Sequence, residues 1–299
     1  AAASESGAAS DKAQGGEEWL TVQHSLGETK IPAQPERIAV THQILIDWLH
    51  PLGYKVSVAP MARPNQEFEP YTPEEQKRDM TLIGPPGEPN LEALLSEEPD
   101  VIFVNWGHDK AYEQLSKIAP SVFVEFQDDW RELLRTYGRM LNKEELAEAW
   151  LNAYQQKAEA AKARLSEAVA GETVVFIRFL PKELRIYANH PTSSVGGVLY
   201  HDLGLKPVSE PAGEMYEAIS LEGLAQLNPD HIFMQIGFVP ATDDEAARRY
   251  NEITEGPVWK GINAVAKNQV YLVESAFFSN SPLGKQYMID VVLENLLGE

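Results

Sequence analysis

Arg178 is the residue whose type and position most directly suggest chemistry. It lies late in the apolar segment "TVVFIRF" at 173–179, which is typical of a buried strand. A buried guanidinium needs an anionic partner, supplied either by the protein or by a ligand. We therefore interpret Arg178 as a candidate ligand-binding residue.

Further candidates are aromatic, histidine and arginine side chains that occupy strand ends or loops. They are His42, Tyr71, Trp106 and His108 in the first half, and Arg185, Tyr187, Tyr216, Phe277 and Phe278 in the second. Trp106 directly follows a strand predicted at 101–105, and ligands of open α/β sheets bind outside the carboxyl ends of the strands. For Trp106, Phe277 and Phe278, packing in the core is an open alternative.

The sequence contains no pattern typical of catalysis or of a metal centre. The seven histidines show no HxH or HExxH spacing, and the absence of cysteine excludes disulfides, zinc–thiolate sites and cysteine nucleophiles. The segment "SSVGG" at 193–197 lacks the lysine of a phosphate loop and the pattern of a nucleophile elbow. We predict a binding protein with no enzymatic activity, no cofactor and no metal held by protein residues.

Composition narrows the class of protein further. The chain has 299 residues, enough for two domains, and a formal net charge of −20, which argues against nucleic-acid binding. Apolar strands alternate with helical patterns through both halves. This predicts the α/β class, with two Rossmann-like lobes on central, mostly parallel sheets and a ligand cleft between the lobes.

A long helix is predicted between the two lobes. Residues 142–170 contain no Gly or Pro, with Asn142 as the predicted N-cap and Gly171 ending the helix, which would span about 43 Å. It would link an N-terminal lobe at 19–141 to a C-terminal lobe at 171–299, although a long surface helix is the alternative. Residues 1–18 are small and polar, which is typical of a flexible tether or a disordered tail.

One phrase occurs twice in the chain. "LEALLSEEPDVIF" at 91–103 and "LEGLAQLNPDHIF" at 221–233 share seven of thirteen positions. Packing of a helix on a sheet accounts for the apolar matches, and Pro-Asp ends each helix. Glu92 and Glu222 should be exposed in the first turn of each helix. They indicate either an interaction with the helix dipole or two equivalent acidic contacts for a partner that touches both lobes.

These segments resemble those of a known family. "PERIAV", "IGPPGEPNLEALLSEEPDVIFVN", "VLYHDLGLKP" and "PVWKGINAVAKNQVYLVE" are similar to the substrate-binding proteins of ABC importers for iron-siderophores and vitamin B12. The resemblance covers about residues 20–298 and is closest to the Gram-positive ferric-siderophore-binding lipoproteins. It implies an extracytoplasmic monomer, either anchored to the cell membrane through a lipidated cysteine just before Ala1 or periplasmic.

The resemblance also implies roles for individual residues. Glu92 and Glu222 would dock onto arginines of the permease dimer, and Arg178, assisted by Tyr187, would donate hydrogen bonds to iron-bound oxygens. The siderophore itself would hold the iron. Because the candidate cleft has few arginines, we expect a hydroxamate or a mixed hydroxamate–citrate ligand rather than a strongly anionic catecholate.

Three alternatives stay open at this point. A heme or cobalamin binder of the same fold could use His42 or His108 as an axial ligand. A two-lobed sugar-transferring enzyme would normally carry a Gly-rich donor-phosphate loop, which the sequence lacks. A purely structural surface protein would leave Arg178 unexplained.

Overall fold

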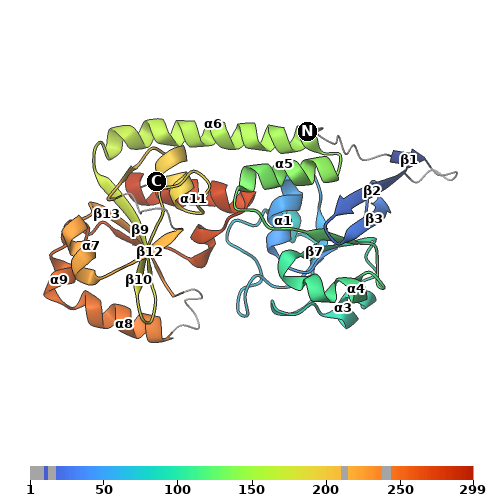
Figure 1. The fold of residues 1–299 in the computed structure, drawn as a ribbon, viewed down its shortest axis with the longest axis horizontal. Helices are drawn as coiled ribbons and strands as arrows, with labels where there is room; N and C mark the ends of the chain where they lie inside the picture. The colour runs from blue at the N-terminus through green and yellow to red at the C-terminus, as the bar shows by residue number, and fades with distance from the viewer. Residues whose placement is uncertain (1–9, 13–17, 210–214, 238–243, 299) are drawn as a thin grey trace, which may run out of the picture. The chain divides into compact units, whose positions relative to one another are not determined.

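The computed structural model describes residues 10–12, 18–209, 215–237 and 244–298 (Figure 1). The chain divides into two compact units. Unit 1 comprises Ala1–Asn152 and Ser281–Leu283, and unit 2 comprises Ala153–Asn280 and Gly284–Glu299. The α/β class predicted from the sequence is confirmed, since each unit is built on its own sheet.

The central sheet of unit 1 is entirely parallel. Its strands, in spatial order, are β6 (Thr81–Leu82), β5 (Val56–Ala59), β4 (Ile38–Val40), β7 (Val101–Asn105) and β8 (Ser121–Val124). All residues of β4, β7 and β8 are buried. Parallel strands covered on both faces are expected to be almost wholly apolar, which is the pattern in these segments.

A second, antiparallel sheet of unit 1 was not predicted. It consists of β1 (Ser10–Lys12), β2 (Glu18–His24) and β3 (Gly27–Pro32), in that order. Leu20 and Val22 of β2 and Ile31 of β3 are buried. Part of the predicted tether, Ser10–Lys12, therefore pairs with β2; its remaining residues lie outside the described ranges, apart from Glu18, which begins β2.

Short helices surround the parallel sheet of unit 1. They are α1 (Ile44–Leu49), η1 (His50–Leu52), α2 (Glu74–Lys77), α3 (Leu91–Ser96), η2 (Trp106–Ala111), α4 (Tyr112–Leu115) and α5 (Trp130–Met140). Sequence analysis did not predict α5. Its N-cap, Asp129, accepts hydrogen bonds from the backbone of Arg131 and Glu132, and Leu133, Leu134 and Tyr137 are buried.

The long linking helix is present as α6, Glu144–Ala168, with 25 residues and a length of about 37 Å (Figure 1). The expected N-cap is wrong: Asn142 has φ 53°, a left-handed conformation that follows the end of α5. The boundary between the units falls within α6, after Asn152. Its buried positions recur every three or four residues, which is the spacing of one helix face; they are Ala147, Leu151, Tyr154, Ala158, Ala161 and Leu165.

The sheet of unit 2 is mixed. Its order is β12 (Tyr216–Ile219), β10 (Leu184–Tyr187), β9 (Thr173–Phe179), β13 (His231–Ile236) and β14 (Val270–Leu272), with β11 (Lys206–Pro207) also pairing with β9. Strand β10 is antiparallel to β9 and β12, whereas β13 is parallel to β9 and β14. The register places Arg178 of β9 between Arg185 and Gln235 on the neighbouring strands.

The helices of unit 2 are η3 (Gly197–Asp202), α7 (Leu221–Leu227), α8 (Asp244–Thr254), α9 (Pro257–Lys260), α10 (Asn263–Ala266), η5 (Ser275–Phe278) and α11 (Pro282–Leu297). Figure 1 shows α7, α8 and α9 beside the sheet, where Leu224 and Trp259 join a core with Ile177 and Ile232. Within the described part of the chain, every helix is too short or too polar to cross a bilayer.

The repeated phrase forms the same structure in both units. Helices α3 and α7 are capped by Asn90 and Ser220, and each leads through Pro-Asp into the next strand. The Asp100 carboxylate accepts from the backbone N–H groups of Glu36 and Arg37, at the start of β4. Asp230 in the same way accepts from the N–H and the hydroxyl of Thr173, at the start of β9.

Candidate functional site

Arg178 lies in a buried group of polar and aromatic side chains in unit 2. Its side chain is 6% exposed, and it donates a 3.0 Å hydrogen bond to Oε1 of Gln235 on the neighbouring strand β13. The guanidinium carbon lies 4.0 Å from the ring centroid of Phe278 and 5.5 Å from that of Tyr187. The Tyr187 and Phe278 rings are themselves 4.9 Å apart. Three of the predicted ligand residues are thus brought together.

The protonation states in this group follow from burial. Burial is the largest effect on Arg178 and lowers the pKa of its guanidinium, while Tyr187 opposes this change. Burial raises the pKa of the Tyr187 phenol, although Arg178 and Arg185 act in the opposite direction. Tyr187 is therefore a neutral hydroxyl at neutral pH and can donate a hydrogen bond.

Arg185 and Tyr216 extend this group along the sheet. The Arg185 guanidinium stacks over the Tyr216 ring, 4.1 Å from its centroid, and pairs with the Glu183 carboxylate. Tyr216 is 38% exposed and lies opposite Tyr187 in the β10–β12 register, with the two ring centroids 6.0 Å apart. These contacts extend the aromatic and basic group across β10 and β12 to the exposed ring of Tyr216.

Phe277 lies in the core instead. Its side chain is 0% exposed and packs against the rings of Phe176 and Phe233, with centroid distances of 5.6 and 5.5 Å. This placement agrees with the alternative of core packing that the sequence left open.

Two histidines lie together at the carboxyl end of the sheet in unit 1. His42 follows β4 and His108 lies in η2, and their ring centroids are 6.5 Å apart. The Thr41 hydroxyl lies 2.9 Å from Nδ1 of His108 and accepts a 2.9 Å hydrogen bond from the Asn105 backbone. Because β4 and β7 are neighbouring parallel strands, the residues that follow them meet at one edge of the sheet.

Both histidines are neutral at neutral pH. Burial, with smaller contributions from His108 and Arg63, lowers the pKa of His42 to about 4. Burial also lowers the pKa of His108, against the opposing effect of Glu88. Since Ile44 N donates to Nδ1 of His42, the proton of the neutral ring is on Nε2. His42 can therefore offer an uncharged N–H donor.

Trp106 directly follows β7, as predicted. It is half-buried and packs against the small core of unit 1 that contains Ile102 and Leu115. Its ring also contacts Phe126, at a centroid distance of 5.3 Å, and Phe126 is 45% exposed. Trp106 thus combines core packing with an exposed aromatic neighbour, and its ligand role stays a prediction.

Tyr71 belongs to a different network in unit 1. Its hydroxyl donates a 2.8 Å hydrogen bond to Oδ2 of Asp47, and Ser281 donates to the same oxygen at 2.5 Å. Asp47 is buried, and this burial raises the pKa of its carboxyl to about 7. Tyr71 therefore has a structural hydrogen bond, and a ligand role for it also stays a prediction.

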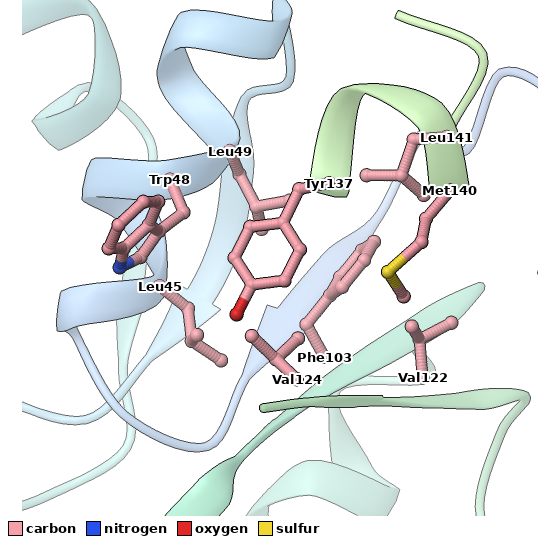
Figure 2. A pocket seen from close by; sticks show the side chains of 9 residues that line it. All are labelled: Leu45, Trp48, Leu49, Phe103, Val122, Val124, Tyr137, Met140 and Leu141. Atoms are coloured by element: carbon pink, nitrogen blue, oxygen red, sulfur yellow. The ribbon is translucent and has the colours of Figure 1, made fainter. Parts of the chain in front are cut away.

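A cavity in unit 1 is too small to be the ligand site. Its lining includes Trp48, Phe103 and Tyr137, from α1, β7 and α5 (Figure 2). Its volume is about 10 Å³, which is at most the space of one water molecule, and pockets for small-molecule ligands are typically about 300–1,000 Å³. None of the predicted ligand residues lines it. We interpret it as a gap in core packing.

Glu92 and Glu222 are exposed in the first turns of α3 and α7. The exposed and buried positions of the two helices match over their first four residues, with Leu94 and Leu224 both fully buried. The two carboxylates are thus presented in equivalent local settings. Among the described residues, no group of three or more His, Asp or Glu side chains is arranged to hold a metal ion.

Sequence reasoning missed Gln235 and Thr41. Gln235 is 0% exposed and ends the apolar segment "HIFMQ", so it carries the same signal as Arg178, a polar side chain within a buried strand. Thr41 directly follows β4 and is buried. A search for polar residues at the ends of predicted strands would have found both.

Comparisons with known proteins agree with this fold. The model of the family described as periplasmic binding protein matches residues 38–276, so the chain belongs to that family. It is 30% identical over 298 residues to the iron(3+)-hydroxamate-binding protein FhuD of Bacillus subtilis (strain 168), which covers 97% of this chain and 90% of that protein. The resemblance inferred from the sequence is confirmed.

Two further similarities support the same assignment. The probable siderophore-binding lipoprotein YfiY of Bacillus subtilis (strain 168) is 28% identical over 275 residues, covering 87% of this chain and 82% of that protein. A solved Bacillus subtilis structure, a periplasmic binding protein component of a Fep/Fec-like ferrichrome ABC transporter, has a TM-score of 0.73 and 26% identity. It covers 92% of this chain and 98% of that one. The family consists of extracytoplasmic transport components rather than enzymes.

Proposed function

We propose that this chain is the substrate-binding component of an ABC importer and that it binds a ferric siderophore of the hydroxamate or mixed hydroxamate–citrate type. The observation that carries the proposal is the buried guanidinium of Arg178, which a neutral amide and aromatic rings surround. Two relatives, a hydroxamate-binding protein and a probable siderophore-binding lipoprotein, support the same class of ligand.

In this proposal Arg178 and Tyr187 donate hydrogen bonds to the oxygens that hold the iron. These oxygens carry partial negative charge even in a complex of low net charge, and charge-assisted hydrogen bonds to them are strong. Phe278 and Tyr216 supply aromatic surface for the organic arms of the ligand. The siderophore supplies all of the iron ligands, so the protein needs to recognise only the outer surface of the complex.

The charges of the candidate residues favour a ligand of low charge. Arg185 pairs with Glu183, and Arg63, whose charge acts on His42, pairs with Glu69, so each of these arginines is balanced by a carboxylate. His42 adds no positive charge at neutral pH because its pKa is about 4. Gln235, which accepts a hydrogen bond from Arg178, is an uncharged amide and adds no charge to the group. A strongly anionic catecholate complex would require a more basic surface.

We further propose His42, His108 and Trp106 of unit 1 as ligand-binding residues. Glu92 and Glu222 would then dock the loaded protein onto arginines of the permease, one from each unit. An N-terminal lipid anchor would hold the protein, as a monomer, at the outer face of a Gram-positive cell membrane. The protein itself would catalyse no reaction.

A ligand panel tests the proposal. The six tryptophans of the chain report binding when the protein is titrated with the ferric complex of desferrioxamine B, ferric citrate, a ferric tris-catecholate, heme and cobalamin. We expect saturable quenching by the trihydroxamate or the citrate complex and none by the metal-free siderophore at equal concentration. Binding of heme or cobalamin alone would change the proposed ligand to another of those bound by this family. If no iron complex quenches the fluorescence, the proposed siderophore binding is refuted.

A further inference from the structure

The loop that contains "SSVGG" is folded tightly on itself in unit 2. The Ser193 hydroxyl donates to the Ala188 carbonyl and accepts from Gly197 N, both at 3.0 Å. A Cβ atom on Gly196 would lie 1.9 Å from the Ala188 oxygen, and one on Gly197 would lie 2.5 Å from the Pro191 oxygen. The two glycines are therefore required by the close approach of the backbone rather than by a bound phosphate.

The hydroxyl of Ser194, in the middle of this loop, points away from the loop to another segment. Its Oγ donates a 2.8 Å hydrogen bond to the carbonyl oxygen of Phe278, in η5. The Ser194 carbonyl in turn accepts a hydrogen bond from Nζ of Lys285, on α11. A chain of two hydrogen bonds thus connects Lys285 through Ser194 to the backbone of Phe278.

Lys285 is an unusual residue in the core of unit 2 because its side chain is 0% exposed. Burial of an ammonium group is unfavourable unless hydrogen bonds compensate for the lost hydration. An apolar side chain of similar length would fill the same space without that penalty. The hydrogen bond from Nζ of Lys285 to the Ser194 carbonyl offsets part of this cost and ties α11 to the loop.

The hydrogen bonds from Lys285 and Ser194 reach Arg178 through Phe278. The guanidinium carbon lies 4.0 Å from the Phe278 ring centroid, and the ring also packs at 4.9 Å against Tyr187. The strands fix the backbone of Arg178, but the face on which its guanidinium rests belongs to η5, outside the sheet. Any displacement of the Phe278 backbone moves that face.

We propose that Ser194 and Lys285 are positioning residues for ligand binding: they hold Phe278 against Arg178 and so fix the direction in which the guanidinium donates. This inference rests on the proposed function, because Arg178 is the group that meets the ligand in that account. A network of hydrogen bonds that fixes a supporting aromatic ring pre-organises the cation before the ligand arrives.

The test is a double-mutant cycle that uses Ser194→Ala and Phe278→Leu, with the ferric complex of desferrioxamine B as the probe and tryptophan quenching as the measurement. Ser194→Ala alone should raise the Kd about 3- to 10-fold, which corresponds to the loss of one hydrogen bond. In the Phe278→Leu background the same substitution should change the Kd less than 2-fold, since the ring that Ser194 positions is gone.

Thr192→Ala is the matched control, because it removes a hydroxyl from the same loop that bonds only locally, to Nδ1 of the exposed His190. Its Kd should equal that of the wild type. Lys285→Met should raise the Kd as much as Ser194→Ala does. If the Lys285→Met variant does not fold, the comparison of Ser194→Ala in the two backgrounds still decides the test.

Each result separates the inference from the function on which it rests. An unchanged Kd in Ser194→Ala, or equal fold-changes for Ser194→Ala in the two backgrounds, would overturn the positioning role while the binding function stands. A wild-type protein that does not bind the ferric probe or ferric citrate would instead refute the proposed function, and the inference with it.

Discussion

At the scale of single residues, Asp47 makes the stability of unit 1 dependent on pH. Its carboxyl is buried and has a pKa of about 7, raised by burial and, to a smaller extent, by Glu69. Tyr71 and Ser281 both donate to Oδ2, which opposes this shift. The folded protein therefore keeps a proton on Asp47 that the unfolded chain releases above about pH 4.

The sign of the effect follows from proton linkage. Between about pH 4 and pH 7 the folded state binds more protons than the unfolded state, so the free energy of unfolding falls as the pH rises through this window. The contribution of Asp47 is fully present below pH 4 and is lost above pH 7. From pH 5 to pH 8 the loss is on the order of 2–3 kcal/mol.

Asp47→Asn tests this account, because an amide oxygen can accept both hydrogen bonds and the side chain has no charge at any pH. At pH 8 we expect the variant to have a Tm roughly 4–10 °C above that of the wild type, and at pH 5 about the same Tm. Thermal melts followed by circular dichroism measure both. The same difference in Tm at the two pH values would contradict the raised pKa.

The sequence predicts that the Arg178 side chain is buried, but it does not predict which residues contact it. A charged side chain within "TVVFIRF" indicates a buried arginine, and Arg178 is buried. Its partner Gln235 lies 57 residues away in the chain, and the contact follows from the register of β9 on β13, which periodicity alone does not define. The ring of Phe278 likewise reaches Arg178 only through the packing of η5.

At the scale of elements, the repeated helix–Pro-Asp–strand unit is the part of the fold that the sequence describes best. Strands β7 and β9 have the predicted bounds, because each is a largely apolar segment between turn residues. The structure adds a role for the aspartates: Asp100 accepts from the two backbone N–H groups just before β4, and Asp230 accepts from the first N–H group of β9. The repeat thus specifies strand pairing as well as helix packing.

Asp100→Ala should therefore destabilise unit 1 without a direct effect on the ligand. It removes the acceptor for the N–H groups of Glu36 and Arg37, at a cost of about 1–3 kcal/mol. The measurement is the Tm, with Glu113→Ala, an exposed acid on α4, as the control that should leave it unchanged. An equal Tm for Asp100→Ala and the wild type would show that these bonds contribute nothing.

The features that the sequence analysis missed or placed wrongly can be explained in physical terms. Asn is favoured both as an N-cap and in the left-handed conformation after a helix, so its type alone cannot distinguish the end of α5 from the start of α6. Asn142, with φ 53°, adopts the second role. Strand β2 buries only Leu20 and Val22, and β3 buries only Ile31, so their apolar signal is weaker than that of the parallel strands.

At the scale of the whole molecule, the repeated sequence segment is explained by two units of the same fold class, each of which contains one copy. Each unit presents one exposed acid from the first turn of an equivalent helix, Glu92 in unit 1 and Glu222 in unit 2. A transporter built from two permease subunits could use one such contact per subunit. Charge-assisted pairs of this kind set orientation and on-rate more than affinity.

Charge reversal at both sites separates docking from ligand binding. Glu92→Arg with Glu222→Arg should leave the Kd for the ferric siderophore within 2-fold of wild type, because neither residue belongs to the candidate ligand groups. Uptake of radioactive iron by cells that depend on this protein should fall at least 10-fold. Glu145→Arg with Glu167→Arg is the matched control, since it changes one exposed acid in each unit by the same charge. Uptake that survives the first pair would exclude these acids as docking contacts.

Whether Arg178 receives the iron complex is measured by calorimetric titration of the ferric complex of desferrioxamine B into the wild-type protein and into Arg178→Ala. We predict saturable one-to-one binding by the wild type and a Kd roughly 10- to 150-fold higher for Arg178→Ala, equivalent to about 1.5–3 kcal/mol for a lost charge-assisted hydrogen bond. Equal Kd values for the two proteins, with both folded, would contradict the claim that Arg178 receives the iron complex.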